Sequence, residues 1–144
     1  MDRKRRRRLT PVIYMLHTNI CIYAARGEDE RLLAKLETFF AGDLVMSAIT
    51  LAELEAGVRR DPALYRQRQQ VLAELARYIP PVPFDAPAAA CFGAVQAAAE
   101  DHKRGAFDRL IAAHAISLDI PLVTNDTRDF RDIPGLKLEN WASE

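Results

Sequence analysis

Four acidic residues stand where predicted strands give way to helices or loops: Glu53, Asp108, Asp126 and Asp129. A fifth position of this kind, directly after the first predicted strand, holds His17. Carboxylates gathered at strand ends can hold a divalent metal ion against a phosphodiester. The acidic set, and the histidine that interrupts it, therefore raise metal-assisted phosphodiester chemistry as a candidate function.

Each acid also has a purely structural explanation. Thr50 and Glu53 have the spacing of a capping box, in which the carboxylate bonds a backbone amide at the start of a helix. Asp108 begins a predicted helix, where a carboxylate stabilises unpaired amides and the positive dipole end. Asp126 and Asp129 lie in a polar turn, where aspartate is common. Composition and spacing leave both explanations open.

Short apolar runs alternate with helical patterns along the chain. Strands are expected at residues 12–16, 44–46, 81–84, 121–124 and 136–138, and helices at 20–26, 29–40, 51–60, 62–78, 86–102 and 108–118. This alternation predicts an α/β fold, a three-layer α/β/α sandwich with a central, mainly parallel sheet. Pro81 and Pro83 cannot donate to a strand ladder, so the third strand is expected at an edge.

In open parallel sheets, sites form beyond the carboxyl ends of the strands. His17, Glu53 and Asp126 follow the first, second and fourth predicted strands, so we expect them to converge there. Asp108 begins the helix that leads into the fourth strand. We therefore expect Asp108 at the opposite end of the sheet unless its loop lifts it over.

The composition predicts one domain preceded by a basic arm. The chain has 144 residues, 49% of them hydrophobic, which suffices for one core. Its formal net charge is zero, yet residues 1–8 alone carry +5. We expect residues 1–11 to be a disordered arm and residues 12–144 a single domain. Nucleic-acid binding by the arm stays open, whereas a secretory signal is disfavoured because polar residues 17–19 break the apolar run.

The remaining composition argues against a membrane or zinc protein. The weakly polar stretch Ala86–Ala99 is too short to span a bilayer. Cys21 and Cys91 lie in apolar helical patterns, so we expect buried, reduced thiols and a cytoplasmic protein. No pairing of cysteine with histidine suggests zinc.

Four local sequences and a closing segment follow one another in a specific order: Leu16-His17-Thr18-Asn19, then residues 47–54, 107–115, 122–130 and 133–141. In this order they closely resemble the PIN-domain family, specifically the VapC toxins of bacterial type II toxin–antitoxin pairs. The resemblance covers roughly residues 12–142. It implies a PIN-like fold and a Mg²⁺- or Mn²⁺-dependent endoribonuclease that cleaves structured RNA, commonly tRNA.

The resemblance also implies an acidic pocket, whose residues would serve as metal ligands and catalytic groups. Carried over by position, they are His17 in place of the family's first aspartate, Glu53, Asp108, and Asp126 with Asp129. Between the last two we favour Asp126 slightly as the main turn ligand.

Other residues are expected to support the pocket or the substrate. Thr18, Asn19 and Thr124 would hold the pocket through hydroxyl and amide hydrogen bonds. Arg109, with Lys103 or Arg104, could contact RNA phosphates, or these could be ordinary surface charges.

His17 departs from the family pattern. An imidazole suits Mn, Zn, Ni or Cu better than Mg, and it lacks the negative charge of a carboxylate. We therefore expect Mg²⁺ binding and RNA cleavage to be strongly weakened in this chain, through natural divergence or a deliberate substitution.

The family implies a small DNA-binding antitoxin as partner, a homodimer, and a higher assembly with the antitoxin. Leu32, Leu36, Phe39 and Phe40 could form a dimer interface or belong to the core. A second interpretation is a catalytically silent PIN-fold protein that binds an antitoxin. A third, a phosphohydrolase of another α/β family, lacks a phosphate-cradling glycine loop.

Overall fold

The computed structural model describes residues 13–99 and 105–143, so the basic arm, Lys103 and Arg104 lie outside the described residues. Its strands are β1 (Tyr14–Leu16), β2 (Leu44–Ser47), β3 (Pro81–Val82), β4 (Leu122–Val123) and β5 (Leu138–Glu139). They form one sheet in the order β3-β2-β1-β4-β5, and every pairing is parallel. The predicted parallel sheet and the edge position of the third strand are confirmed.

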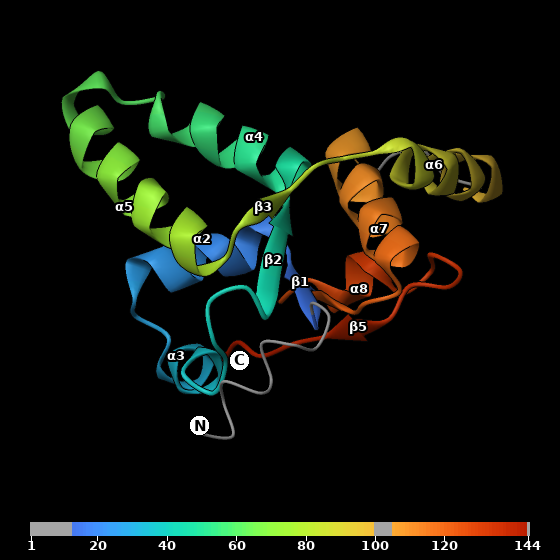
Figure 1. The fold of residues 1–144 in the computed structure, drawn as a ribbon, viewed down its shortest axis with the longest axis horizontal. Helices are drawn as coiled ribbons and strands as arrows, with labels where there is room; N and C mark the ends of the chain where they lie inside the picture. The colour runs from blue at the N-terminus through green and yellow to red at the C-terminus, as the bar shows by residue number, and fades with distance from the viewer. Residues whose placement is uncertain (1–12, 100–104, 144) are drawn as a thin grey trace.

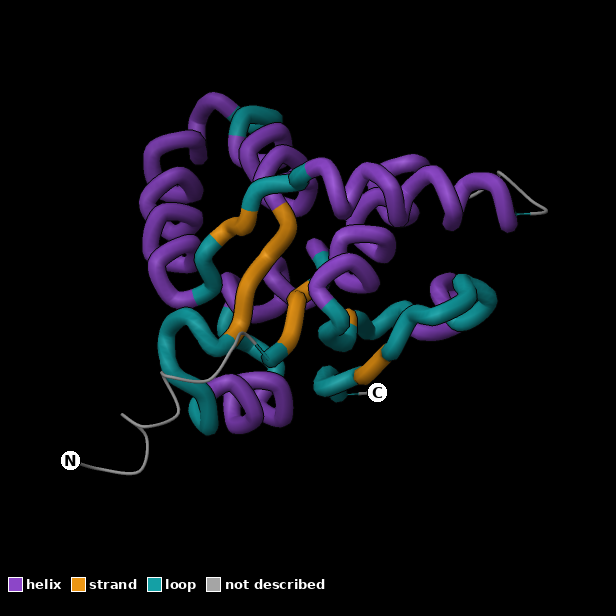
Figure 2. The backbone as a smooth tube through the Cα atoms, turned by 45° about the vertical axis from the view of Figure 1, so that its right-hand side comes forward, coloured by secondary structure: helices purple, strands orange, loops and turns teal. Residues whose placement is uncertain are grey.

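The helices are α2 (Thr18–Arg26), α3 (Glu30–Leu36), α4 (Ala48–Val58), the short 3₁₀ helix η1 (Pro62–Leu64), α5 (Tyr65–Tyr78), α6 (Ala86–Ala98), α7 (Ala106–Leu118) and α8 (Thr127–Phe130). Figure 1 places α2, α3 and α5 on one side of the strands and α6, α7 and α8 on the other. Figure 2 shows the strands enclosed between these groups. The three-layer sandwich is confirmed.

Neighbouring strand residues point to opposite faces of the sheet, and each face has its own core cluster. Met15 and Leu122 pack with α6, α7 and α8, whereas Leu16 and Val123 pack with α2, α3 and α5. The strands are apolar at successive positions because both faces are covered. Leu32 and Leu36 lie in the second cluster with Phe39 packed against it, so these residues belong to the core.

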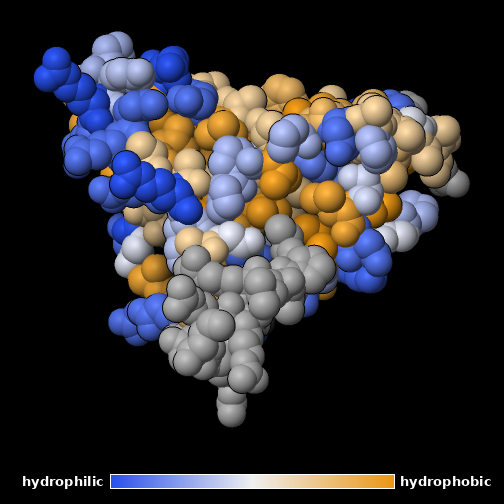
Figure 3. Space-filling model, in the orientation of Figure 1, coloured by the Kyte–Doolittle hydropathy of each residue, from blue (hydrophilic) through white to orange (hydrophobic). Residues whose placement is uncertain are grey.

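The outer helices differ in how they meet solvent. The sequence of α5 is rich in Arg and Gln, and the surface over it is largely hydrophilic in Figure 3. The sequence of α6 is mostly alanine, and the surface over it is largely apolar. No helix among the described residues is long and apolar enough to cross a membrane.

Several helix ends follow from single residues. Gly27, with φ of 68°, ends α2 in the left-handed conformation that glycine adopts at low cost. Asp29 caps α3 and Asp85 caps α6, each accepting a backbone N–H. Cys21 of α2 is fully buried, which raises the pKa of its thiol to about 12.

The start of α4 differs from the sequence expectation. Ser47 caps this helix by accepting the N–H of Ile49 at 3.1 Å, so α4 begins at Ala48 rather than Leu51. Thr50 is consequently inside the helix and is not its N-cap. The capping-box interpretation of Glu53 is therefore wrong.

The end of the sheet predicted for Asp108 is also wrong. A helix that leads into a parallel strand runs antiparallel to that strand. The end of α7 leads to the amino end of β4, so the start of α7 lies at the carboxyl end of the strands. Asp108 is in the first turn of α7, which Gly105 caps without a side-chain hydrogen bond. It thus joins the other candidate residues without any special loop.

A buried pair joins α7 to the start of α4. The Nδ1 atom of His114 lies 2.8 Å from the Oγ atom of Ser47, and both side chains are buried. The ring of Phe84 meets the His114 ring edge-on at 5.3 Å between centroids. This contact fixes the helices that carry Glu53 and Asp108 relative to each other.

The segment after β5 closes the other side of the sheet. The ring of Trp141 stacks on that of Phe39 at 5.4 Å and meets Tyr14 edge-on at 4.8 Å. The Tyr78 hydroxyl lies within hydrogen-bonding distance of the carbonyls of Leu36 and Phe39, at 2.6 and 2.8 Å. These contacts hold the short helix α3 against the core.

Leu122 tests how much the covered strands contribute to stability. Because Leu122 is fully buried on β4, Leu122→Ala is expected to lower the free energy of unfolding in urea by about 2–5 kcal/mol. Leu118→Ala is the matched control, since Leu118 is 41% exposed and its loss should change stability by less than about 0.5 kcal/mol. Equal effects of the two substitutions would contradict the assigned core.

His114 makes stability depend on pH. Burial lowers the pKa of His114 below its ordinary value of 6.5, and the charge of Asp85 and the carbonyl of Pro83 oppose this only partly. The unfolded chain therefore binds a proton at a higher pH than the folded chain does, and stability falls as pH drops below about 6.5. Urea unfolding at several pH values between about 7.5 and 5.5 should show this loss, and His114→Asn should reduce the slope. An unchanged slope in the variant would refute the assignment.

Candidate active site

His17 lies at the centre of the candidate site. It follows β1 directly, precedes α2, and is only 6% exposed. Its Nε2 atom lies 3.0 Å from the Asp108 Oδ1 atom, and its Nδ1 atom lies 3.0 Å from the Thr124 Oγ1 atom. The Phe130 ring meets the imidazole edge-on at 4.9 Å. One side chain thus joins the ends of β1 and β4 to the start of α7.

The Thr124 hydroxyl and the Asp108 carboxylate face the two ring nitrogens of His17. The Thr124 hydroxyl accepts the backbone N–H of Asp126 at 3.0 Å and the side-chain amide of Asn19 at 3.3 Å. Two acceptors lie near its single hydrogen atom, the Nδ1 atom of His17 at 3.0 Å and the side-chain oxygen of Asn19 at 3.5 Å. An ionised carboxylate can only accept, so Nε2 of His17 carries the hydrogen that it donates to Asp108, and in a neutral ring Nδ1 is then an acceptor facing the Thr124 hydroxyl.

Glu53 is held from a different direction. It lies in the second turn of α4, and its Oε1 atom accepts the Thr18 hydroxyl at 2.6 Å. Thr18 is the first residue of α2, and its oxygen is also 3.2 Å from the Thr50 hydroxyl. Through this hydrogen bond Thr18 can hold Glu53 in place, which is the supporting role expected from the sequence.

Asp126 and Asp129 form a second pair of carboxyl groups. Burial raises the pKa of Asp126, and so do a hydrogen bond that its protonated form donates to Asp129 and the negative charges of Asp129 and Asp108, while His17 acts in the opposite direction. A hydrogen bond between two carboxyl groups needs a proton on one of them. The structure brings both aspartates to the site, and the preference for Asp126 over Asp129 stays a prediction.

Two residues of the polar network were not singled out from the sequence. The Asn19 amide donates to the side-chain oxygen of Asn125, whose own amide donates to the Tyr23 hydroxyl at 2.9 Å. Asn125 and Tyr23 also line a cavity of about 530 Å³ with Arg26, Glu28, Asp29, Glu30 and Ser143. Asn125 belongs to the motif after β4, but Tyr23 has no sequence signal beyond its place on α2.

Arg109 does not have either role considered from the sequence. It is only 8% exposed, and its Nε atom donates to the Gln96 side-chain oxygen at 2.7 Å. A buried guanidinium that joins α7 to α6 is neither a surface charge nor positioned for RNA phosphates. Its sequence position beside Asp108 was misleading because neighbouring helix residues point about 100° apart.

The arrangement of the side chains does not fit a Mg²⁺ ion. Within residues 13–99 and 105–143, no group of three or more histidine, cysteine, aspartate or glutamate side chains is arranged to hold a metal ion. The carboxylate of Asp108 already has a hydrogen bond to His17, and that of Glu53 has one to Thr18. Asp126 and Asp129 are hydrogen-bonded to each other. Imidazole is also a poor ligand for Mg²⁺, which prefers oxygen.

Comparisons with known proteins agree with this fold. The family model of the PIN domain matches residues 14–136. Ribonuclease VapC2 of Rickettsia felis is 35% identical over 133 residues, covering 90% of this chain and 98% of the relative. The tRNA(fMet)-specific endonuclease VapC of Shigella flexneri is 32% identical over 131 residues, with the same two coverages of 90% and 98%.

Solved structures give the same result. VapBC2 from Rickettsia felis, bound to a DNA fragment from its promoter, matches with a TM-score of 0.82 and 36% identity over 90% of this chain and 99% of that chain. DNA-bound VapBC from Salmonella typhimurium matches with a TM-score of 0.84 and 29% identity over 91% and 99%. In sequence and in fold, the chain belongs to the PIN-domain family, and its relatives there are the VapC ribonucleases.

Proposed function

We propose that this chain is the toxin of a toxin–antitoxin pair, an endoribonuclease fold whose metal binding and RNA cleavage are weakened by His17. The observation that carries the proposal is the hydrogen bond from His17 to Asp108 at 3.0 Å. The expected substrate is a structured RNA such as tRNA, and the expected cofactor is Mg²⁺ or Mn²⁺. The substrate class is supported by a relative named as a tRNA(fMet)-specific endonuclease.

The charge balance explains why His17 would weaken the site. Two carboxylates at residues 17 and 108 would repel each other and would favour a cation between them. His17 instead donates a hydrogen bond to Asp108, so this carboxylate has a partner without any metal. A divalent ion that binds Asp108 would have to break that hydrogen bond. It would also be held by one negative charge fewer than in a site with an aspartate at residue 17.

The proposed roles of the other residues follow from their contacts. Glu53, Asp108, Asp126 and Asp129 are the proposed catalytic acids at the carboxyl ends of the strands. Thr18 orients Glu53, and Thr124 orients His17 with the help of Asn19. These hydroxyl and amide groups fix side chains and have no proposed part in bond cleavage themselves.

The proposed partners rest on the neighbouring structures, which are VapBC complexes, two of them with DNA. For this chain we propose a small DNA-binding antitoxin, a homodimer that joins it in a higher assembly, and a cytoplasmic location. Membership of the PIN family removes the interpretation as a phosphohydrolase of another α/β family.

The second candidate function is a silent PIN-fold partner of an antitoxin. It is favoured by the same hydrogen bond, because a site whose acids already have internal partners does not need metal to be stable. Its carboxylates could still receive a guanidinium from a partner protein, since arginine pairs well with carboxylates.

His17→Asp separates the two functions. The variant should bind Mg²⁺ and Mn²⁺ in isothermal titration, and it should cleave total tRNA at least about 100-fold faster than the parent chain. Without metal it should unfold at a lower temperature than the parent, because the introduced carboxylate would repel that of Asp108. Added Mg²⁺ should restore that temperature, which gives a readout independent of cleavage.

His17→Asn is the matched control, since it has the size of aspartate without its charge. It should lose the hydrogen bond of His17 and gain neither metal binding nor cleavage. Glu53→Gln in the His17→Asp chain should abolish the recovered cleavage. If His17→Asp binds metal but does not cut RNA, the proposed nuclease function is wrong and the silent partner is favoured.

A further inference from the structure

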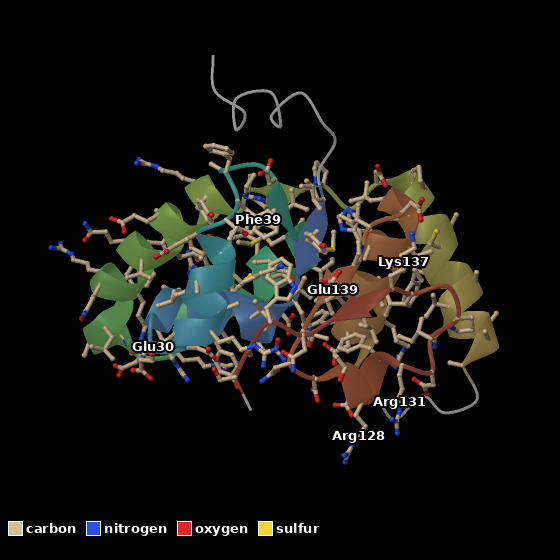
Figure 4. The ribbon with its side chains drawn as sticks, turned by 90° about the horizontal axis from the view of Figure 1, so that it is seen from below. Glu30, Phe39, Arg128, Arg131, Lys137 and Glu139 are labelled. Atoms are coloured by element: carbon tan, nitrogen blue, oxygen red, sulfur yellow. The ribbon has the colours of Figure 1, made fainter. Side chains whose placement is uncertain are left out.

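Two arginines stand beside the acidic site on α8. Arg128 and Arg131 are three residues apart, and Arg131 continues the helical conformation beyond Phe130, so both lie on one face. Asp129 lies between them in the chain, and Asp126 is the N-cap residue of the same helix. Figure 4 shows both arginines pointing away from the body of the protein on the same side.

These two cations differ from others whose charge is already used. Arg59 pairs with Glu55 at 2.7 Å, Lys137 pairs with Asp119 at 3.2 Å, and Arg109 is buried against Gln96. Arg128 and Arg131 are exposed, and no ion pair joins either of them to another residue of 13–99 or 105–143. Their guanidinium groups are therefore available to an external anion.

An RNA substrate has an electrostatic problem at this site. Asp108 with the hydrogen-bonded pair Asp126 and Asp129 keeps a net negative charge that repels the phosphates of an approaching backbone, even with the hydrogen bond from His17 to Asp108. A guanidinium bonds two phosphate oxygens at once and keeps its charge at every physiological pH. Two such groups on the rim would attract the phosphates that flank the one nearest the acids.

We propose that Arg128 and Arg131 form a phosphate-binding pair that holds the RNA backbone on α8 beside the acidic residues. The proposal rests on the proposed function, because it takes RNA as the substrate. It assigns to α8 the phosphate contact that the sequence suggested for Arg109. The two arginines are positioning residues, and they take no part in bond cleavage.

The test measures binding without cleavage. Fluorescence anisotropy of fluorescein-labelled bulk tRNA, in EDTA and over a range of salt concentrations, is recorded with the full chain. Arg128→Gln with Arg131→Gln should lower the slope of log Kd against log salt by about 1.4–1.8, the loss expected for two phosphate contacts. Between about 50 and 200 mM salt, the parent should therefore lose roughly 7–12-fold more affinity than the variant does.

The matched control is Arg77→Gln with Lys137→Gln, which removes the same total charge. Arg77 is in the last turn of α5 and Lys137 directly precedes β5, so both lie at the amino ends of the strands. Figure 4 shows Lys137 well above Arg128 and Arg131, which lie at the lower edge of the view. Loss of its exposed ion pair with Asp119 should cost little stability. This control should keep the salt slope of the parent.

The outcomes separate the pair from the function. If the parent binds tRNA and the α8 variant keeps the same slope, the arginine pair is refuted while an RNA substrate stands. If the control loses as much as the α8 variant, net charge rather than a local contact explains binding, and the pair is again refuted. If the parent does not bind tRNA at low salt, the proposed RNA substrate is refuted together with the pair.

Discussion

Mutual repulsion between carboxylates is the constraint on which the site depends. Parallel strands deliver side chains to one edge, and here that edge receives Asp108, Asp126 and Asp129 with His17 among them. Close carboxylates must be protonated, hydrogen-bonded or neutralised by a cation. This chain combines a hydrogen bond from His17 to Asp108 with another between Asp126 and Asp129. The rest of the fold serves to keep those partners within reach.

The hydroxyl of Thr124 positions the imidazole of His17 although it carries no charge. It receives two N–H groups and lies 3.0 Å from Nδ1 of His17, which holds the ring so that Nε2 faces Asp108. A carboxylate at residue 17 could receive the same hydroxyl but could not donate to Asp108. The surrounding residues thus suit histidine or aspartate at residue 17, whereas only the aspartate would need a cation to offset its repulsion from Asp108. A single side chain can change what the site holds without changing the fold.

Most of the fold could be predicted from local sequence because local forces set it. Apolar runs located the strands, the carboxylates of Asp29 and Asp85 cap helices, and Gly27 ends one because glycine adopts positive φ at low cost. The errors concerned tertiary direction. The location of Asp108 needed the polarity of a crossover helix, and the burial of Arg109 needed the packing of α6 on α7. Tyr23 reached the site network only through a contact about 100 residues distant, which no local pattern encodes.

The stacking of Trp141 on Phe39 joins residues about 100 positions apart, and Trp141 is the single tryptophan of the chain. Closing so long a loop costs entropy before any contact repays it. The pairing of Met15 in β1 with Leu122 in β4 closes a loop of similar length, so the Trp141–Phe39 contact belongs to the long-range part of the fold. Intrinsic tryptophan fluorescence therefore reports whether the segment after β5 has packed against Phe39, a contact between distant parts of the chain, rather than the formation of any local helix.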